Sequence, residues 1–260
     1  MLFKKPILII AVLILLIGIS FYFYQNYQKQ KIYDQAVLSA KNPPDHTLVF
    51  VGDSMTAYLG NFDELRYNLK QSYPNKNFLL LNYGFGSTNI LSVEDRISKE
   101  SSHSGRIFEP INDIDFDYVF IESFGHNPLS EFSLEEGLKK QTEALERIVS
   151  LISTRHPRES IIFIATIAPN KDHYAEGVTV LQPEQREQWV EEREAYIKNH
   201  IEFARSHGIP IVNIYEKSLK EETGNIDYIN TTDFIHPSPT GIRFISEEIA
   251  KFIVQNNFFN

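Results

Sequence analysis

One short stretch, residues 47–56, places a serine where it could act as a nucleophile. Apolar and β-branched residues occupy positions 48–51 and stop at Gly52, and the small hydroxyl residue Ser54 follows before a helix-like segment. This pattern predicts a buried strand that carries Ser54 to its C-terminal end, where open α/β sheets place their chemistry. Because a serine hydroxyl needs a base to take its proton, the stretch also predicts a partner histidine elsewhere in the chain.

The histidine with suitable surroundings is His236. It lies in residues 231–241, a segment rich in turn-forming residues just before the last predicted helix. Asp233 stands three residues ahead, close enough for a turn to bring its carboxylate to the imidazole and fix its tautomer. A serine, an imidazole and a carboxylate fill the three roles of a catalytic triad. Taken alone, each has a structural explanation: Ser54 as a helix N-cap, and His236 as a capping or buried histidine.

Two further loops follow predicted strands and carry candidate hydrogen-bond donors. Residues 81–89 contain Gly84 and Gly86, where glycine lets the backbone bring an amide hydrogen into a cleft beside the first strand. Residues 120–128 contain Asn127, whose uncharged side chain can stabilise an oxyanion without occupying the base. Either loop alone is also explained as an ordinary turn between a strand and a helix.

Strand-like and helix-like segments alternate along the rest of the chain. Strands are expected at residues 47–51, 77–82, 118–123, 160–167 and 209–214, and helices at residues 63–72, 133–154, 183–207 and 240–255. Strands that are apolar on both faces and separated by helices indicate a parallel sheet covered by helices on each side. The predicted fold class is therefore α/β, a three-layer α/β/α sandwich with a mainly parallel five-stranded sheet.

Composition narrows the functional classes. A chain of 260 residues with 42% hydrophobic residues can bury a full core, and it favours one large domain over two. The formal net charge of -9, without a clustered basic stripe, argues against nucleic-acid binding. The absence of cysteine excludes disulfides, thiolate nucleophiles and cysteine-ligated metals.

The N-terminus predicts a membrane anchor. Residues 6–24 carry no charge and end in aromatic residues, which is the length and composition of a transmembrane helix. A cleaved signal peptide is the alternative, but the apolar run is long for one and no small-x-small site follows it. We expect an anchor with a short cytoplasmic tail at residues 1–25, a juxtamembrane linker at 26–45 and a catalytic domain at 46–260. A first span so near the start acts as a signal anchor, which would put the domain outside the cytoplasm.

Four short motifs occur in a fixed order along the chain: Gly52-Asp53-Ser54, the turn at Gly86, Gly125-x-Asn127 and Asp233-x-x-His236. Together they resemble the four signature blocks of the SGNH hydrolases, also called the GDSL esterase/lipase family. The resemblance extends over residues 48–241. It implies a flavodoxin-like α/β/α sandwich that hydrolyses an ester with a serine nucleophile, without a metal or another cofactor.

The resemblance also implies a role for each matched residue. Ser54 would attack the acyl carbon, His236 would act as base and then as acid, and Asp233 would orient His236. The oxyanion hole would consist of the Ser54 amide, the Gly86 amide and the Asn127 side chain.

Some positions depart from the family pattern or have no role in it. The second block is one residue shorter between its glycines than is usual, so Gly84 is an alternative to Gly86 as donor. The family often has an aspartate after the asparagine of the third block, where this chain has Pro128. Glu122 and His126 either line the pocket or serve a structural role.

The leading hypothesis is a membrane-anchored serine esterase that faces the outside and removes short acyl groups from envelope glycans or lipids. One alternative is an O-acyltransferase that passes the acyl group to a sugar hydroxyl instead of water. Another is a surface binding module that keeps the fold without catalysis. The membrane, through the N-terminal helix, and an acyl-ester substrate are the expected partners, and nucleic acid is not.

Overall fold

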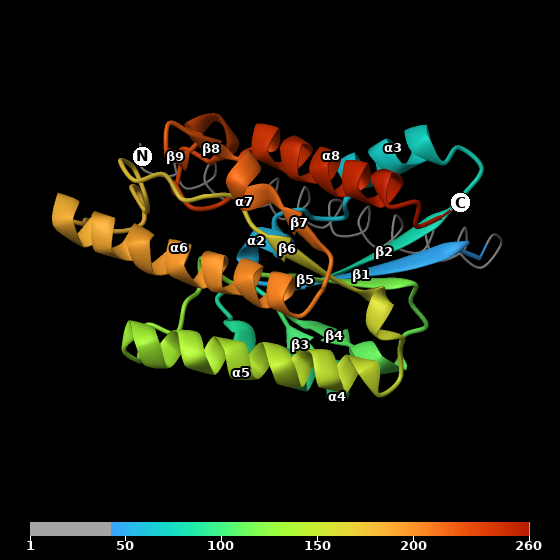
Figure 1. Ribbon diagram of the computed structural model, residues 1–260. Coiled ribbons are helices and arrows are strands. Elements are labelled where there is room, and N and C mark those ends of the chain that lie inside the picture. Colours follow the sequence, from blue (N-terminus) through green and yellow to red (C-terminus); the bar gives the residue numbers. More distant parts are fainter. Residues whose placement is uncertain (1–42, 260) are drawn as a thin grey trace, which may run out of the picture. The chain divides into compact units, whose positions relative to one another are not determined.

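A parallel five-stranded sheet forms the centre of the described part of the protein (Figure 1). The computed structural model describes residues 43–259. The strands are β1 (His46–Gly52), β2 (Phe78–Gly84), β5 (Tyr118–Glu122), β6 (Ile161–Ala165) and β7 (Ile211–Asn213). They lie in the order β2-β1-β5-β6-β7, and each neighbouring pair is parallel. This is the flavodoxin-like strand order, in which the chain reverses its direction of travel across the sheet beside β1.

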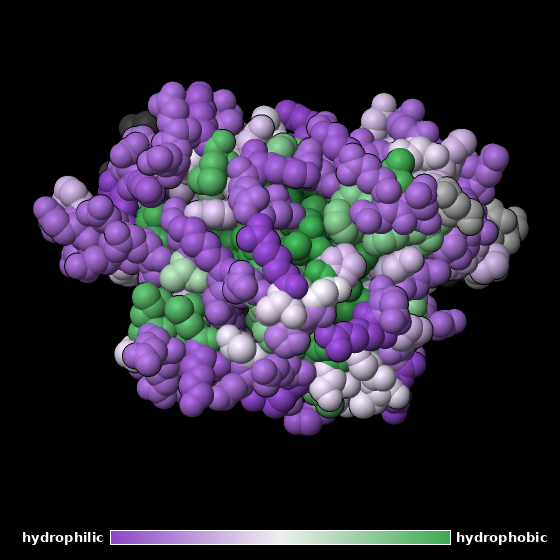
Figure 2. All heavy atoms as spheres, in the orientation of Figure 1, coloured by the Kyte–Doolittle hydropathy of each residue, from purple (hydrophilic) through white to green (hydrophobic). Residues whose placement is uncertain are grey.

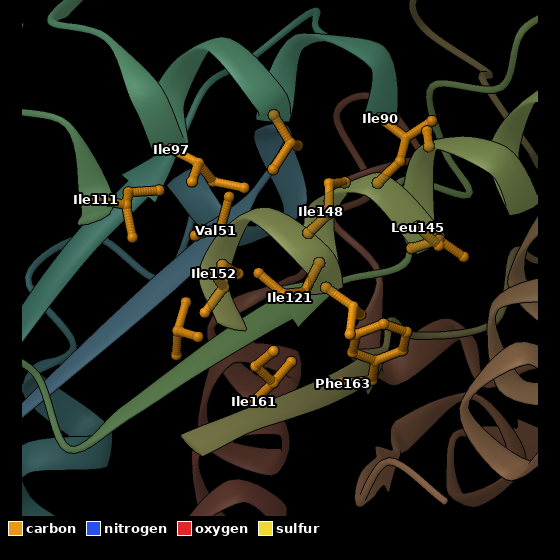
Figure 3. Close-up of a cluster of buried hydrophobic side chains, with 14 of the residues drawn as sticks. Val51, Ile90, Ile97, Ile111, Ile121, Leu145, Ile148, Ile152, Ile161 and Phe163 are labelled. Atoms are coloured by element: carbon orange, nitrogen blue, oxygen red, sulfur yellow. The ribbon is translucent and has the colours of Figure 1, made fainter. Parts of the chain in front are cut away.

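Helices cover both faces of the sheet (Figure 1). One face packs against α2 (Ser54–Ala57), α3 (Asp63–Ser72) and α8 (Pro239–Gln255), and the other against α4 (Val93–Ser98), α5 (Leu134–Ser153) and α6 (Pro183–Ser206). Because successive side chains of a strand point to opposite faces, Leu48 and Phe50 join the core under α3 and α8, while Val49 and Val51 join the core under α5. Figure 3 shows the core under α5. The predicted three-layer sandwich with a five-stranded parallel sheet is confirmed.

The long helices form where the sequence predicts them because their boundaries carry clear signals. Ser133 accepts a hydrogen bond from the Glu136 amide and so caps α5. Pro183 stands at the first turn of α6, where a missing amide hydrogen costs nothing. On the face seen in Figure 2, hydrophilic residues cover most of the surface, as expected when the apolar stripes of these helices face the sheet.

Several short elements were not predicted. They are α7 (Ile214–Lys217), the hairpins β3 (Ser101–His103) with β4 (Arg106–Phe108) and β8 (Leu219–Lys220) with β9 (Thr223–Gly224), and the 3-10 turns η1 (Ile90–Ser92), η2 (Ile111–Asp113), η3 (Arg158–Ser160) and η4 (Ile226–Tyr228). α4 was missed as well, whereas α2 is the helix-like segment expected after Ser54. Elements of two to six residues are too short to show a hydrophobic period.

The predicted anchor at residues 1–25 lies outside the described residues, as does nearly all of the linker at 26–45. Within residues 43–259, no helix combines the length and the apolar character needed to cross a bilayer. A compact unit begins at Asp45. The division into anchor, linker and catalytic domain stays a prediction.

Candidate active site

Ser54, His236 and Asp233 form a hydrogen-bonded series at the C-terminal edge of the sheet. Ser54 is the first residue of α2, two positions after β1 ends, and His236 lies in the loop before α8. The Ser54 Oγ atom is 2.8 Å from His236 Nε2, and His236 Nδ1 is 2.9 Å from Asp233 Oδ2. Residues 182 positions apart in sequence are therefore within direct hydrogen-bonding distance.

The Asp233 carboxylate holds both the backbone and the ring of His236. Its Oδ1 atom accepts hydrogen bonds from the Ile235 amide (2.9 Å) and the His236 amide (3.0 Å), while Oδ2 faces the imidazole. Burial alone would raise the pKa of Asp233, but the hydrogen bonds from the His236 ring and these two amides outweigh it and hold the pKa below its usual range. An ionised Asp233 accepts the Nδ1 hydrogen, which leaves His236 Nε2 as the acceptor for the Ser54 hydroxyl.

Two glycines let the nucleophile helix lie directly on the strand ends. A Cβ atom at Gly52 would lie 2.0 Å from Thr56 Oγ1, and one at Gly84 would lie 2.3 Å from the Ala57 amide nitrogen. The Gly84 amide also donates to Asn82 Oδ1 at 2.9 Å. Gly84 is thus occupied in holding α2 and is not available as an oxyanion donor.

Gly86 has the opposite surroundings. The nearest atom to a Cβ built there would be Ser54 Cβ, at 3.8 Å, so the glycine lies beside the serine without crowding it. Its amide makes no hydrogen bond to any residue within 43–259. Of the two candidate glycines, Gly86 is the one positioned to donate beside Ser54.

Asn127 lies on the turn after β5 and is oriented by Asp53. Its Nδ2 atom donates to Asp53 Oδ2 at 2.7 Å, and Asp53 Oδ1 accepts from the Met55 amide at 2.7 Å. Asp53, the residue before Ser54, therefore both caps α2 and orients the Asn127 amide. Because the amide group has two hydrogens, the second stays available for a substrate oxygen.

Two buried carboxyl groups lie behind this edge. Glu122 Oε1 accepts from Ser123 Oγ (2.8 Å) and from the Phe124 amide (2.9 Å), and Glu122 Oε2 is 3.4 Å from the Asp53 amide nitrogen. Burial raises the pKa of Asp53, against hydrogen bonds from Asn127 and the Met55 amide. Burial and the nearby Asp53 charge raise the pKa of Glu122 well above its usual value. Within the described part of the chain, no cluster of three potential ligands could hold a metal ion.

Arg96 supplies the positive charge of this region, and sequence reasoning missed it. Its Nη1 atom donates to the carbonyls of Gly52 (2.7 Å) and Tyr83 (3.0 Å), which joins the ends of β1 and β2. Burial lowers the pKa of Arg96 to about 10, and the charges of Asp53 and Glu122 oppose that fall. Nothing around Arg96 in the sequence distinguishes it from an exposed helix arginine, because its carbonyl partners are brought to it by the fold.

His126 has a structural role and is not one of the candidate catalytic residues. Its Nδ1 atom is 3.1 Å from the Tyr174 hydroxyl and its Nε2 atom is 3.1 Å from the Ile167 carbonyl. Burial lowers the pKa of His126 to about 4, so the ring is neutral at neutral pH. Of the two roles considered, His126 takes the structural one, because its ring contacts brace the turn that carries Asn127. Glu122 holds the same turn through the Phe124 amide and also lines a small, mainly apolar cavity.

Comparisons with known proteins agree with this arrangement. Residues 50–244 match the model of the GDSL-like lipase/acylhydrolase family. No curated protein matches the chain at a significant level.

Several solved structures share the fold. A lipase/acylhydrolase from Enterococcus faecalis is 17% identical, with a TM-score of 0.58 over 81% of this chain and 96% of that one. A GDSL-like lipase from Bacteroides thetaiotaomicron is 13% identical, with a TM-score of 0.55 over 86% of this chain and 97% of that one. An acetyl xylan esterase is 16% identical, with a TM-score of 0.53 over 79% and 98%. Such identities show a shared fold alone, whereas the family model matches most of the sequence, and the chain therefore belongs to the GDSL-like lipase/acylhydrolase family.

Proposed function

We propose that this protein is a serine esterase in which Ser54 forms an acyl-enzyme intermediate. The observation that carries the proposal is the unbroken series from Asp233 through His236 to Ser54, with distances of 2.9 and 2.8 Å. Family membership gives the class of bond, an acyl ester. The geometry supports Ser54 as the nucleophile, His236 as its base and Asp233 as the group that orients the base.

In the first half-reaction, Ser54 Oγ attacks the acyl carbon while His236 Nε2 takes the hydroxyl proton. The tetrahedral intermediate then collapses, His236 gives that proton to the departing alkoxide, and the acyl group stays on Ser54. In the second half-reaction, His236 takes a proton from water, the resulting hydroxide attacks the acyl-serine, and Ser54 Oγ recovers its proton as the acid leaves. Asp233 stays ionised and stabilises the imidazolium in both halves.

The negative oxygen of each tetrahedral intermediate accepts hydrogen bonds from the Ser54 amide, the Gly86 amide and Asn127 Nδ2. Because Asp53 already holds Asn127 at 2.7 Å, this donor does not reorganise during the reaction. One such preorganised donor contributes about 3 to 4 kcal/mol to the transition state.

For the substrate, we propose short acyl esters on cell-envelope glycans or lipids. Two points support this: the apolar N-terminal segment, which predicts a membrane anchor with the catalytic domain outside the cytoplasm, and the shared fold with an acetyl xylan esterase. Acetate release from acetylated xylan and other O-acetylated glycans, and fatty-acid release from ester lipids, by the purified full-length chain would rank these classes. Release from none of them would contradict the substrate assignment.

The nucleophile is tested with p-nitrophenyl acetate and a fluorophosphonate probe on the full-length chain. We expect Ser54→Ala to abolish both hydrolysis and labelling. Ser130→Ala, at an exposed serine in the loop before α5, is the matched control and should leave both unchanged. Wild-type turnover by Ser54→Ala would show that another residue is the nucleophile.

A further inference from the structure

The ring of Tyr58 lies flat on the imidazole of His236. The two ring centroids are 4.0 Å apart and the planes differ by 2°. Tyr58 is 42% exposed, so it does not belong to either core. Its hydroxyl makes no hydrogen bond to any residue within 43–259, which leaves the ring face as its contact with the site.

The position of Tyr58 follows from α2. The Tyr58 amide donates to the Ser54 carbonyl at 2.9 Å, so the two residues are one helical turn apart and lie on the same side of the helix. The short helix that presents the nucleophile therefore also presents a flat aromatic surface to the base. Displacing this helix would move Ser54 and Tyr58 together.

The hydrogen bonds of His236 do not fix its ring by themselves. Both bonds lie at ring nitrogens, with Asp233 at Nδ1 and Ser54 at Nε2. A ring held at two points on its edge can still tilt about the line between them. A second ring packed in parallel on one face opposes that tilt, and its π-electrons attract the imidazolium that forms during turnover.

We propose that Tyr58 is a positioning residue that holds the plane of the His236 imidazole. This inference rests on the proposed function, because it requires His236 to be the base. Tyr58 keeps Nε2 directed at the Ser54 hydroxyl before attack and at the leaving oxygen afterwards. The aromatic face does this work, and the phenol hydroxyl takes no part.

Two substitutions of Tyr58 separate the contribution of the aromatic ring from those of the hydroxyl and of side-chain volume. Tyr58→Phe keeps the ring, and Tyr58→Leu keeps an apolar side chain without it. With p-nitrophenyl acetate and the full-length chain, we expect Tyr58→Phe to retain kcat. Tyr58→Leu should lower kcat about three- to tenfold, the loss that corresponds to one aromatic contact. KM should stay within about twofold of wild type in both, since positioning acts on proton transfer rather than on binding.

A second readout does not depend on turnover. The Nδ1 proton that His236 shares with Asp233 should give a far-downfield NMR resonance in the wild type and in Tyr58→Phe. In Tyr58→Leu it should broaden, because a tilting ring exposes this proton to exchange with water. The fluorophosphonate labelling rate should fall by the same factor as kcat. Tyr67→Leu, at an exposed tyrosine of α3, is the matched control and should change none of these values.

The outcomes distinguish this inference from the proposed function. Wild-type kcat and an unchanged Nδ1 resonance in Tyr58→Leu would overturn the positioning role, while loss of activity in Ser54→Ala would still support the esterase. An equal loss of kcat in Tyr58→Phe and Tyr58→Leu would assign the effect to the hydroxyl and would also overturn the positioning role. A raised KM with normal kcat in Tyr58→Leu would make Tyr58 a substrate contact and would overturn the positioning role. Activity in Ser54→Ala would remove the basis for both.

Discussion

Two histidines at the same edge of the sheet, His236 and His126, have opposite surroundings. Each has a partner at both ring nitrogens. His236 lies between a carboxylate and a serine hydroxyl, whereas His126 lies between a carbonyl and a phenol and is 7% exposed. The difference shows that full hydrogen bonding does not make a base.

What makes a base is a partner that stabilises the protonated ring, and Asp233 supplies that negative charge to His236. His126 has no carboxylate at either nitrogen, and burial keeps it neutral. We therefore propose that the same residue type carries a proton at position 236 and is a fixed, neutral residue at position 126.

The comparison predicts that His236→Gln causes the largest loss of kcat and that His126→Gln causes only a small one. Without an imidazole at position 236, nothing takes the Ser54 proton, and kcat should fall roughly 10⁴- to 10⁶-fold. His126→Gln should stay within about tenfold of wild type, because glutamine can still donate to the Ile167 carbonyl. Steady-state hydrolysis of p-nitrophenyl acetate checks both, and equal losses would contradict the distinction.

The next effect concerns the charge on Asp233. In Asp233→Asn the side-chain oxygen still accepts from the Ile235 and His236 amides, but the amide hydrogens then face His236 Nδ1 and favour the wrong imidazole tautomer. We expect kcat to fall roughly 10³- to 10⁴-fold with the fold intact.

The charge on Asp233 can also be checked by comparing the pH dependence of stability in the wild type and in Asp233→Asn. Because the pKa of Asp233 is lowered on folding, its contribution to stability is full above the unfolded value and is lost as the pH falls through the folded one. Asp233→Asn should therefore reduce the acid dependence of unfolding, measured by urea titration. An unchanged acid dependence would count against the ionised Asp233.

A smaller effect is expected for Asn127, which acts on the transition state without moving a proton. Asn127→Ala should lower kcat about 10²- to 10³-fold and leave KM nearly unchanged. Asp53→Asn can keep the cap on α2 through its side-chain oxygen, but it puts a donor where Asn127 Nδ2 had its acceptor, so Asn127 loses its orientation. Because the Asn127 side chain itself remains, the loss should be smaller than that of Asn127→Ala. The reverse order would place the main role of the pair at Asp53.

The sequence was sufficient for the sheet, the long helices and the three loops of the site, because each depends on a local pattern. It could not choose between Gly84 and Gly86, since that choice depends on the packing of α2 against β2. Arg96 and Tyr58 were beyond it for the same reason. The fold brings the Gly52 and Tyr83 carbonyls to Arg96, and it brings His236 to Tyr58. None of these partners is a sequence neighbour that a local pattern could reveal.

The smallest effect on activity is expected at His126, whose contribution is to stability. Folding lowers its pKa from an ordinary 6.5 to about 4, so the unfolded chain binds a proton there first as the pH falls. The contribution of neutral His126 to the free energy of unfolding is complete above the pKa of the unfolded chain. It is lost as the pH falls from that value towards the pKa of the folded chain. Between pH 7.5 and pH 5 this amounts to about 2 kcal/mol.

The free energy of unfolding of His126→Gln should therefore fall less over the same pH interval, by about 2 kcal/mol, than that of the wild type. Urea unfolding at the two pH values measures this difference, and contributions from all other groups cancel between the two proteins. Equal pH dependence in both would mean that the ring at position 126 is protonated as readily in the folded chain as in the unfolded one. His126 would then no longer contrast with His236 as a fixed, neutral residue.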